Sequence, residues 1–157
     1  MLCGFVGSGK TTHGRRLEAA GCARLSVDEA VFERHGLHGV DYDEGEYPEH
    51  EAEARAELDQ RLRDLIAAGR CVVLDYGFWS RERRDYYKHL VEDAGGRWRL
   101  LYFKTDLAEI RTRLHQRNQR EGANALFVSD RHFEEFLTRW HPPVDEGEEV
   151  IEPANRA

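Results

Sequence analysis

Residues 4–11 read Gly-Phe-Val-Gly-Ser-Gly-Lys-Thr and form a complete phosphate-binding pattern, G-x-x-x-x-G-K-[ST]. The glycines in this stretch permit backbone conformations in which successive N–H groups point at phosphate oxygens. Lys10 can place its charge on the β- and γ-phosphates, and the Thr11 hydroxyl can bind Mg²⁺. An apolar stub precedes the pattern and a helix-compatible run follows it, as the motif requires. We therefore predict a nucleoside triphosphate site made by Gly7, Ser8, Gly9, Lys10, Thr11 and Thr12.

Two aspartates follow predicted strands and supply the carboxylates that phosphoryl transfer needs. Asp75 comes directly after the apolar run 71–74, at a strand's carboxyl end, where open parallel sheets bind their ligands. It is predicted to hold Mg²⁺ together with the threonine of the motif, although an aspartate here can also simply begin a turn. Asp28 follows the predicted strand 23–26 and is predicted to accept the proton of an attacking hydroxyl. The alternative is that Ser26 or Asp28 caps a short helix.

Arginines recur along one face of a later predicted helix. Arg113, Arg117 and Arg120 lie at positions i, i+4 and i+7. A positive stripe that leads into a glycine- and asparagine-containing break suits a lid that offsets the charge of a transferred phosphoryl group. We therefore predict a lid over residues 111–128, with Arg113 and Arg117 as its catalytic arginines. The alternative is a solvated row of surface charges.

The composition favours a single soluble domain. The chain has 157 residues, a net charge of −7 and 34% charged residues, which predicts one domain over residues 1–157. The acidic balance disfavours an extended nucleic-acid surface, and no apolar stretch is long enough to span a membrane. We expect a cytoplasmic protein without a structural zinc, because the histidines and cysteines show no paired spacing. Cys3, Cys22 and Cys71 are expected to be buried, reduced thiols.

The elements that position these residues alternate between strands and helices, which predicts a parallel sheet covered on both faces. Apolar runs predict strands over residues 1–6, 23–26, 71–74 and 98–103, with a short edge strand at 150–151. Periodic apolar positions predict helices over about 10–20, 48–68 and 80–93, and two more that begin near 106 and 129. Residues 35–47 are expected to form a mobile surface loop, and residues 152–157 are expected to be flexible.

The apolar stripes of two helices also predict which side chains face the core. Tyr86 and Tyr87 are expected to point inward from the helix over 80–93. Leu107 and Ile110 are expected to do so from the helix that begins near residue 106.

Four segments in combination resemble a known group of proteins. They are 4–12, 25–28 (Leu-Ser-Val-Asp), 74–84 (Leu-Asp-Tyr-Gly-Phe-Trp-Ser-Arg-Glu-Arg-Arg) and 113–118 (Arg-Leu-His-Gln-Arg-Asn). The chain resembles the small P-loop kinase-like proteins of the zeta-toxin, chloramphenicol phosphotransferase and polynucleotide kinase group. The resemblance implies a three-layer α/β P-loop NTPase fold, with a parallel five-stranded sheet in the order 2-3-1-4-5, helices on both faces and a small lid. It also implies that Asp28 activates the acceptor and that an arginine of segment 113–117 belongs to the lid.

The resulting hypothesis is an ATP- and Mg²⁺-dependent kinase that acts on a hydroxyl of a small molecule. ATP is favoured over GTP because the guanine-reading sequence N-K-x-D does not occur. One alternative is a 5′-hydroxyl polynucleotide or nucleoside kinase, in which Arg81, Arg83 and Arg84 line a basic groove unless they pair with neighbouring acids. Another is an ATP-hydrolysing switch or partner-binding module, in which the acid-rich region 35–53 is a partner surface.

Overall fold

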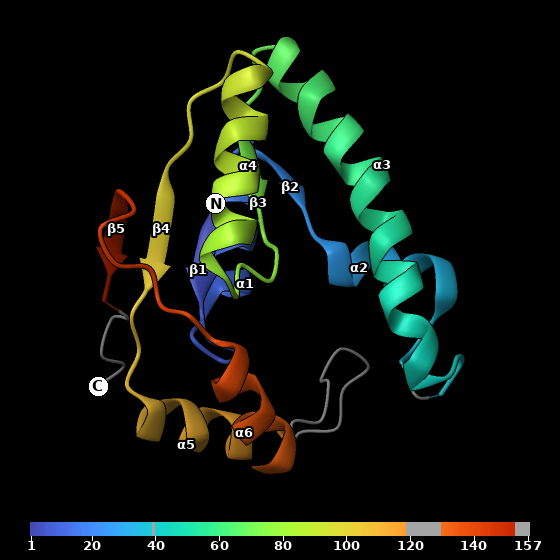
Figure 1. Ribbon diagram of the computed structural model, residues 1–157, viewed down its shortest axis with the longest axis vertical. Coiled ribbons are helices and arrows are strands. Elements are labelled where there is room, and N and C mark those ends of the chain that lie inside the picture. Colours follow the sequence, from blue (N-terminus) through green and yellow to red (C-terminus); the bar gives the residue numbers. More distant parts are fainter. Residues whose placement is uncertain (39, 119–129, 153–157) are drawn as a thin grey trace. The chain divides into compact units, whose positions relative to one another are not determined.

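The computed structural model of this chain describes residues 1–38, 40–118 and 130–152. Strands and helices alternate along the chain (Figure 1). The chain forms two compact units. Unit 1 comprises Met1 with residues 11–76 and 86–98, and unit 2 comprises residues 2–10, 77–85 and 99–157. No helix in the described ranges is both long enough and apolar enough to cross a membrane.

Unit 1 is built on a two-stranded parallel sheet of β2 (Ala23–Leu25) and β3 (Val72–Leu74). Its helices are α2 (Val27–His35), α3 (Tyr47–Ala67), nearly all of α1 (Lys10–Ala19) and the second part of α4 (Arg81–Asp93). Helices α2 and α3 pack side by side, and α3 also contacts both strands (Figure 1). The buried apolar residues of this unit include Leu25, Val27, Val31, Ala54, Leu58, Leu62, Val73, Leu74, Tyr87, Leu90 and Val91.

The predicted elements of unit 1 are confirmed within one or two residues, but two details differ. Tyr86 was expected to face the core, and this is wrong, because 51% of it is exposed and its hydroxyl donates a 2.9 Å hydrogen bond to Asp59 Oδ2. The predicted loop over 35–47 contains an isolated bridge between His38 and Tyr42 and the short 3-10 helix η1 (Glu44–Glu46).

Unit 2 is built on a three-stranded parallel sheet in the order β1 (Leu2–Gly4), β4 (Leu100–Phe103), β5 (Glu148–Ile151). The expected edge strand is therefore present, as β5. Helices α5 (Leu107–Asn118) and α6 (Asp130–Arg139) supply a cluster of buried residues around Phe5. The expectation that Leu107 faces the core is wrong, since it is 43% exposed; it is the first residue of α5, one turn before the buried Ile110. Residues 119–129, which include the whole second half of the predicted lid, and residues 153–157 lie outside the described part of the chain.

The strand pairings agree with the expected order where they occur. Parallel pairs β2–β3, β1–β4 and β4–β5 are all present. They belong to two separate sheets, so the expected single sheet of five strands is not confirmed among the described residues. The α/β class, with parallel strands and intervening helices, is confirmed.

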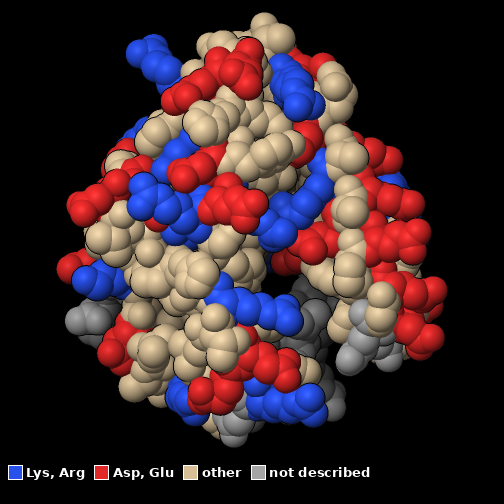
Figure 2. All heavy atoms as spheres, viewed as in Figure 1, with Lys and Arg blue, Asp and Glu red and all other residues tan. Residues whose placement is uncertain are grey.

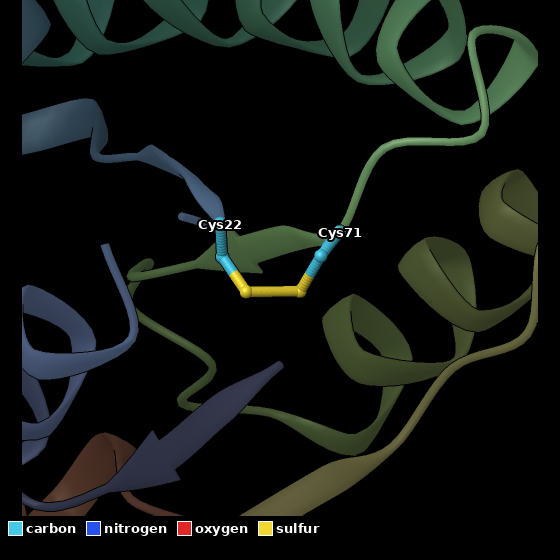
Figure 3. The surroundings of a disulfide bond; sticks show 2 residues. All are labelled: Cys22 and Cys71. Carbon is cyan, nitrogen blue, oxygen red and sulfur yellow. A yellow bond between two sulfur atoms is a disulfide. The ribbon is translucent and has the colours of Figure 1, made fainter. Parts of the chain in front are cut away.

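The expectation of reduced, buried cysteines is wrong for two of the three. Cys22 and Cys71 form a disulfide whose Cα atoms lie 4.7 Å apart (Figure 3). The pairing follows from the register of the sheet, because Ala23 lies opposite Val72 and the residues that precede them therefore face each other. Sequence spacing could not reveal this, since 49 positions separate the two cysteines. Cys3 is a free, buried thiol.

Candidate nucleotide-binding site

The phosphate loop of unit 2 runs from the end of β1 to Lys10, where α1 begins. Gly7 and Gly9 have φ angles of 81° and 97°, in the left-handed region that favours glycine. Apart from its neighbours along the chain, no heavy atom of the described residues lies within 4 Å of the position that a Cβ would take at Gly9, so the backbone there is open to a ligand as far as the described residues go. Open backbone at the N-terminus of a helix suits an anion, and the loop therefore fits the phosphates of a nucleotide.

Ser8 and Thr12, two further residues of the predicted nucleotide site, differ in their exposure. Ser8 is only 2% exposed, and within the described chain its Oγ has no hydrogen-bond partner. A Cβ at Gly4 would come 2.7 Å from this oxygen, so the side chain of Ser8 packs against β1. Thr12 is exposed in the first turn of α1.

Aromatic and aliphatic side chains of unit 2 pack against the phosphate loop. The ring of Phe5 lies 5.2 Å from the ring of Phe133 and 5.8 Å from that of Trp79, both edge to face. Leu114 of α5 approaches to 3.2 Å of the position that a Cβ would take at Gly7, so a side chain there would crowd it. Close packing of this kind restricts the shapes that the loop can adopt. Trp79 is thus a packing residue.

Lys10 is the last residue of the phosphate loop, and its side chain contacts the loop's own backbone. Its Nζ donates hydrogen bonds to the carbonyl oxygens of Gly4 at 2.7 Å and Phe5 at 2.9 Å. An ammonium group can donate hydrogen bonds but cannot accept them, and it carries a compact positive charge at the end of a flexible side chain. These two bonds hold that charge beside the backbone that is predicted to bind phosphate.

In unit 1, Thr11 and Asp75 lie side by side. The Thr11 hydroxyl donates a 3.4 Å hydrogen bond to Asp75 Oδ1, and the side chain of Asp75 is 5% exposed. Asp75 directly follows β3, and its N–H donates to Leu25 O at 2.9 Å, which extends the pairing of the sheet by one residue. Two ligands at right angles on Mg²⁺ lie about 3 Å apart, close to this spacing, and Mg²⁺ prefers oxygen donors. The pair therefore fits the metal role predicted for Thr11 and Asp75.

Arg24 also binds Asp75, and the sequence reasoning missed it. Its Nη1 donates to Asp75 Oδ2 at 3.1 Å, its Nε donates to Glu18 at 3.1 Å, and its Nη2 pairs with Glu29. The side chain is 5% exposed. Burial alone would lower the pKa of Arg24, but the hydrogen bonds that it donates to Glu18 and Glu29 raise it above the ordinary value. The signal that could have indicated this contact is the position of Arg24 in the strand next to β3. Arg24 lies opposite Val73, two residues before Asp75.

Asp28 lies in the first turn of α2 and is exposed. Ser26 is the N-cap of this helix, since its Oγ accepts from Glu29 N at 3.4 Å, so the predicted capping role belongs to Ser26 and not to Asp28. Asp28 Oδ1 accepts a 3.1 Å hydrogen bond from the Tyr47 hydroxyl. Burial, followed by the negative charge of Asp28, raises the pKa of Tyr47 well above its ordinary value, so Tyr47 stays a donor.

The predicted lid arginines are only partly described. Arg113 lies on α5, one-third exposed, and forms an ion pair with Glu109 of the same helix. Arg117 lies on the same helix, but its side chain falls outside the description, as does the whole of Arg120. The arginine lid therefore stays a prediction.

Arg84 has a different role from the one that the sequence suggested. It is 0% exposed, and its Nε and Nη2 donate to Glu146 at 2.7 and 2.6 Å. Its Nη1 donates to Phe78 O at 3.0 Å and His141 O at 2.8 Å. Its ion-pair partner is therefore distant in the sequence, whereas Arg81 pairs with the neighbouring acid Asp85. A guanidinium whose nitrogens all donate to groups of the protein holds segments together, and is not available to bind an external phosphate.

Comparison with solved structures shows the same fold in kinases. The chain is similar to a sugar kinase from Janibacter sp., with 18% identity and a TM-score of 0.60 over 96% of this chain and 82% of that one. It is similar to a gluconokinase from Sinorhizobium meliloti, with 19% identity and a TM-score of 0.63 over 98% and 81%. It is also similar to Chaetomium thermophilum Kti12 in complex with ADP-AlF3, with 17% identity and a TM-score of 0.67 over 99% and 88%.

The sequence itself is assigned by a protein-family model. No curated protein matches the chain. The family AAA_33, described as an AAA domain, matches residues 1–143, which include the phosphate loop, Asp28, Asp75 and Arg113. The predicted resemblance to P-loop kinase-like proteins is confirmed by this match and by the fold of the solved kinases. The chain is a P-loop kinase-like protein and belongs to the AAA domain family AAA_33.

Proposed function

We propose that this protein transfers the γ-phosphate of ATP to a hydroxyl group of a small molecule. The observation that carries the proposal is the pairing of Thr11 with Asp75, because a hydroxyl directly after the phosphate-loop lysine and a carboxylate directly after a parallel strand suit a nucleotide-bound Mg²⁺. When bound, Mg²⁺ would neutralise part of the phosphate charge.

The other steps of the transfer are assigned to separate residues of the chain. Lys10 and the loop backbone would bind the phosphates of ATP, Lys10 through its charge and the loop through N–H groups. Asp28 would accept the proton of the attacking hydroxyl, which orients the oxygen for attack. The Tyr47 hydroxyl holds one oxygen of Asp28 and so fixes the direction of its carboxylate. Arg113 and Arg117 would offset charge on the transferred phosphoryl group.

The choice of a small molecule rests on charge and on fold. Acidic side chains gather over the region of α3 (Figure 2), a helix that carries Glu49, Glu51, Glu53, Glu57, Asp59 and Asp64. Such a surface repels a nucleic-acid backbone. The arginine cluster that favoured a polynucleotide substrate is reduced, because Arg84 is buried against Glu146 and Arg81 pairs with Asp85. The solved sugar kinase and gluconokinase, whose fold this chain shares, support a small hydroxyl acceptor.

The test is transfer of labelled γ-phosphate from ATP to a panel of sugars, sugar acids, nucleosides and a single-stranded oligonucleotide. We expect label on a small hydroxyl compound, with Lys10→Ala abolishing transfer and weakening ATP binding. Arg16→Ala, which removes an exposed charge from the same helix, is the matched control and should leave both intact. Unchanged transfer in Lys10→Ala would refute the assignment. Label found only in free phosphate with every acceptor would favour the hydrolytic switch instead.

A further inference from the structure

Three metal-binding side chains meet in unit 1, in a place that the proposed phosphotransfer does not use. His35, His50 and Glu53 each offer one ligand atom, and these atoms all lie within 4.8 Å of one another. We propose that they bind a divalent transition-metal ion of the zinc type, which ties the end of α2 to the beginning of α3. Two imidazoles and a carboxylate select zinc-like ions, whereas the oxygen-only pair of Thr11 and Asp75 suits Mg²⁺.

His35 argues most directly for a bound ion. It is the last residue of α2, and it is partly buried. Its Nε2 is buried and has no hydrogen-bond partner within the described part of the chain. Leaving a buried polar atom unsatisfied costs free energy, and native proteins rarely do so without a ligand, ion or water. A metal ion bound to Nε2 would satisfy this atom.

His50 and Glu53 supply two ligands from one face of one helix. They lie at positions i and i+3 of α3, so their side chains are neighbours on its surface. His50 is partly buried and Glu53 is exposed. A site with three protein ligands and one exposed side leaves a coordination position open for water.

The two histidines already face each other. Their rings are stacked, with centroids 3.6 Å apart and planes 10° from parallel. The ring of Tyr42 lies edge-on to both, 4.9 Å from His50 and 6.3 Å from His35. An imidazole binds a metal in the plane of its ring, so the rings must tilt out of the stack to share one ion. Rotation about side-chain bonds is sufficient, because the ligand atoms are within reach of one another.

The site would close the segment between the two helices. The backbone from Gly36 to Glu49 lies between the ligands along the chain, and it includes Tyr47, which donates to Asp28. A metal that binds both ends of this segment in the folded chain, and not in the unfolded chain, would stabilise the folded state. Spacing along the sequence missed the site because His35 and His50 belong to different helices.

The experiment uses the full chain without a polyhistidine tag, stripped with a chelator and held in excess Mg²⁺. Calorimetric titration with Zn²⁺ and visible absorption with Co²⁺ should each report a single ion per chain, and Zn²⁺ should raise the unfolding temperature. We expect His50→Ala to weaken Zn²⁺ binding by about 100-fold or more, since even partners of metal ligands typically contribute 10–100-fold. Glu53→Gln, at an exposed position that tolerates change, should weaken it by about 10-fold or more.

Two controls separate this site from others. His89→Ala removes an exposed histidine of α4 in the same unit and should bind Zn²⁺ as the unaltered chain does. Asp75→Asn should also keep Zn²⁺ binding, because Asp75 belongs to the proposed Mg²⁺ site. The proposal would be overturned if the unaltered chain did not bind Zn²⁺. It would also be overturned if His50→Ala and Glu53→Gln both bound Zn²⁺ as tightly as the unaltered chain does. Either result leaves the phosphotransferase proposal to its own test.

Discussion

Arg24 donates a 3.1 Å hydrogen bond to Oδ2 of Asp75, while Thr11 donates to the other oxygen of the same carboxylate. Both Arg24 and Asp75 have side chains that are only 5% exposed. The carboxylate is therefore held between a cation on β2 and the hydroxyl that follows the phosphate-loop lysine. Arg24 thus acts as a positioning residue, which orients Asp75 and leaves Oδ1 directed at Thr11.

Asp75→Asn tests the metal role of this carboxylate. An amide keeps the shape but loses the charge, so we expect the Mg²⁺ concentration required for half-maximal turnover to rise about 10–100-fold. The measurement is turnover at saturating ATP as Mg²⁺ is varied. Asp93→Asn changes an exposed aspartate at the end of α4 and serves as the matched control. Identical Mg²⁺ curves for Asp75→Asn and the unaltered chain would remove Asp75 from the metal site.

Asp28→Asn tests the proton acceptor. The substitution should lower turnover by about 10²–10⁴-fold with little change in ATP affinity, because general base catalysis acts on the chemical step. Tyr47→Phe removes only the hydroxyl that donates to Asp28 at 3.1 Å, and a smaller loss is expected. Single-turnover kinetics and equilibrium ATP binding separate the two effects. If both variants turn over as fast as the unaltered protein, Asp28 is only a residue of the first turn of α2.

Arg84 and Glu146 should be essential to the stability of unit 2. Arg84→Met leaves Glu146 buried without its partner, and breaking a buried ion pair costs about 3–5 kcal/mol. The double variant Arg84→Met/Glu146→Leu removes both charges and should recover much of this loss. Urea unfolding at neutral pH measures each free energy. The control is Arg99→Met, which breaks another two-bond arginine–glutamate pair, with Glu149, on the exposed surface. An equal loss for Arg84→Met and Arg99→Met would contradict the prediction.

The disulfide between Cys22 and Cys71 should add stability by restricting the unfolded chain. For residues separated by 49 positions, loop-closure entropy corresponds to about 4 kcal/mol at most. In urea unfolding, the free energy of unfolding of the double variant Cys22→Ser/Cys71→Ser should be lower by a large part of this amount. A reductant should lower the free energy of unfolding of the unaltered protein to the value of the double variant. The double variant should not respond to the reductant. A reductant without effect on the unaltered protein would show that the bond does not form in solution.

Cys3 should make the protein less stable in alkali. Burial raises the pKa of this thiol from 9.0 to about 11, although the nearby charge of Arg84 acts in the opposite direction. Between these values the folded chain keeps a proton that the unfolded chain loses, so stability falls as the pH rises. Two units correspond to about 3 kcal/mol at most. Chemical unfolding from pH 9 to 11 should show a smaller decline in Cys3→Ala than in the unaltered protein; equal declines would exclude the thiol as the cause.

The phosphate loop and the elements around it were predictable because their signals are local. The loop motif requires glycine at positions with positive φ, and Gly7 and Gly9 have it. Helix α3 was predicted within one residue at each end from its apolar spacing and from Pro48 in its first turn. The placement of Asp75 directly after β3 followed in the same way from a short apolar run.

Contacts between distant segments were decided by the tertiary structure alone. Arg84 binds Glu146, Arg24 binds Asp75, and Cys22 bonds to Cys71, although no local pattern marks these residues as partners. Each pair depends on strand register or on the packing of separate elements. Neither the register nor the packing can be read from residues that are adjacent in the sequence. The sequence by itself therefore determined which chemistry is present, through the motif and its flanking elements. Only the folded chain decided which charges face each other, because ion pairs and disulfides form between segments that are adjacent in space.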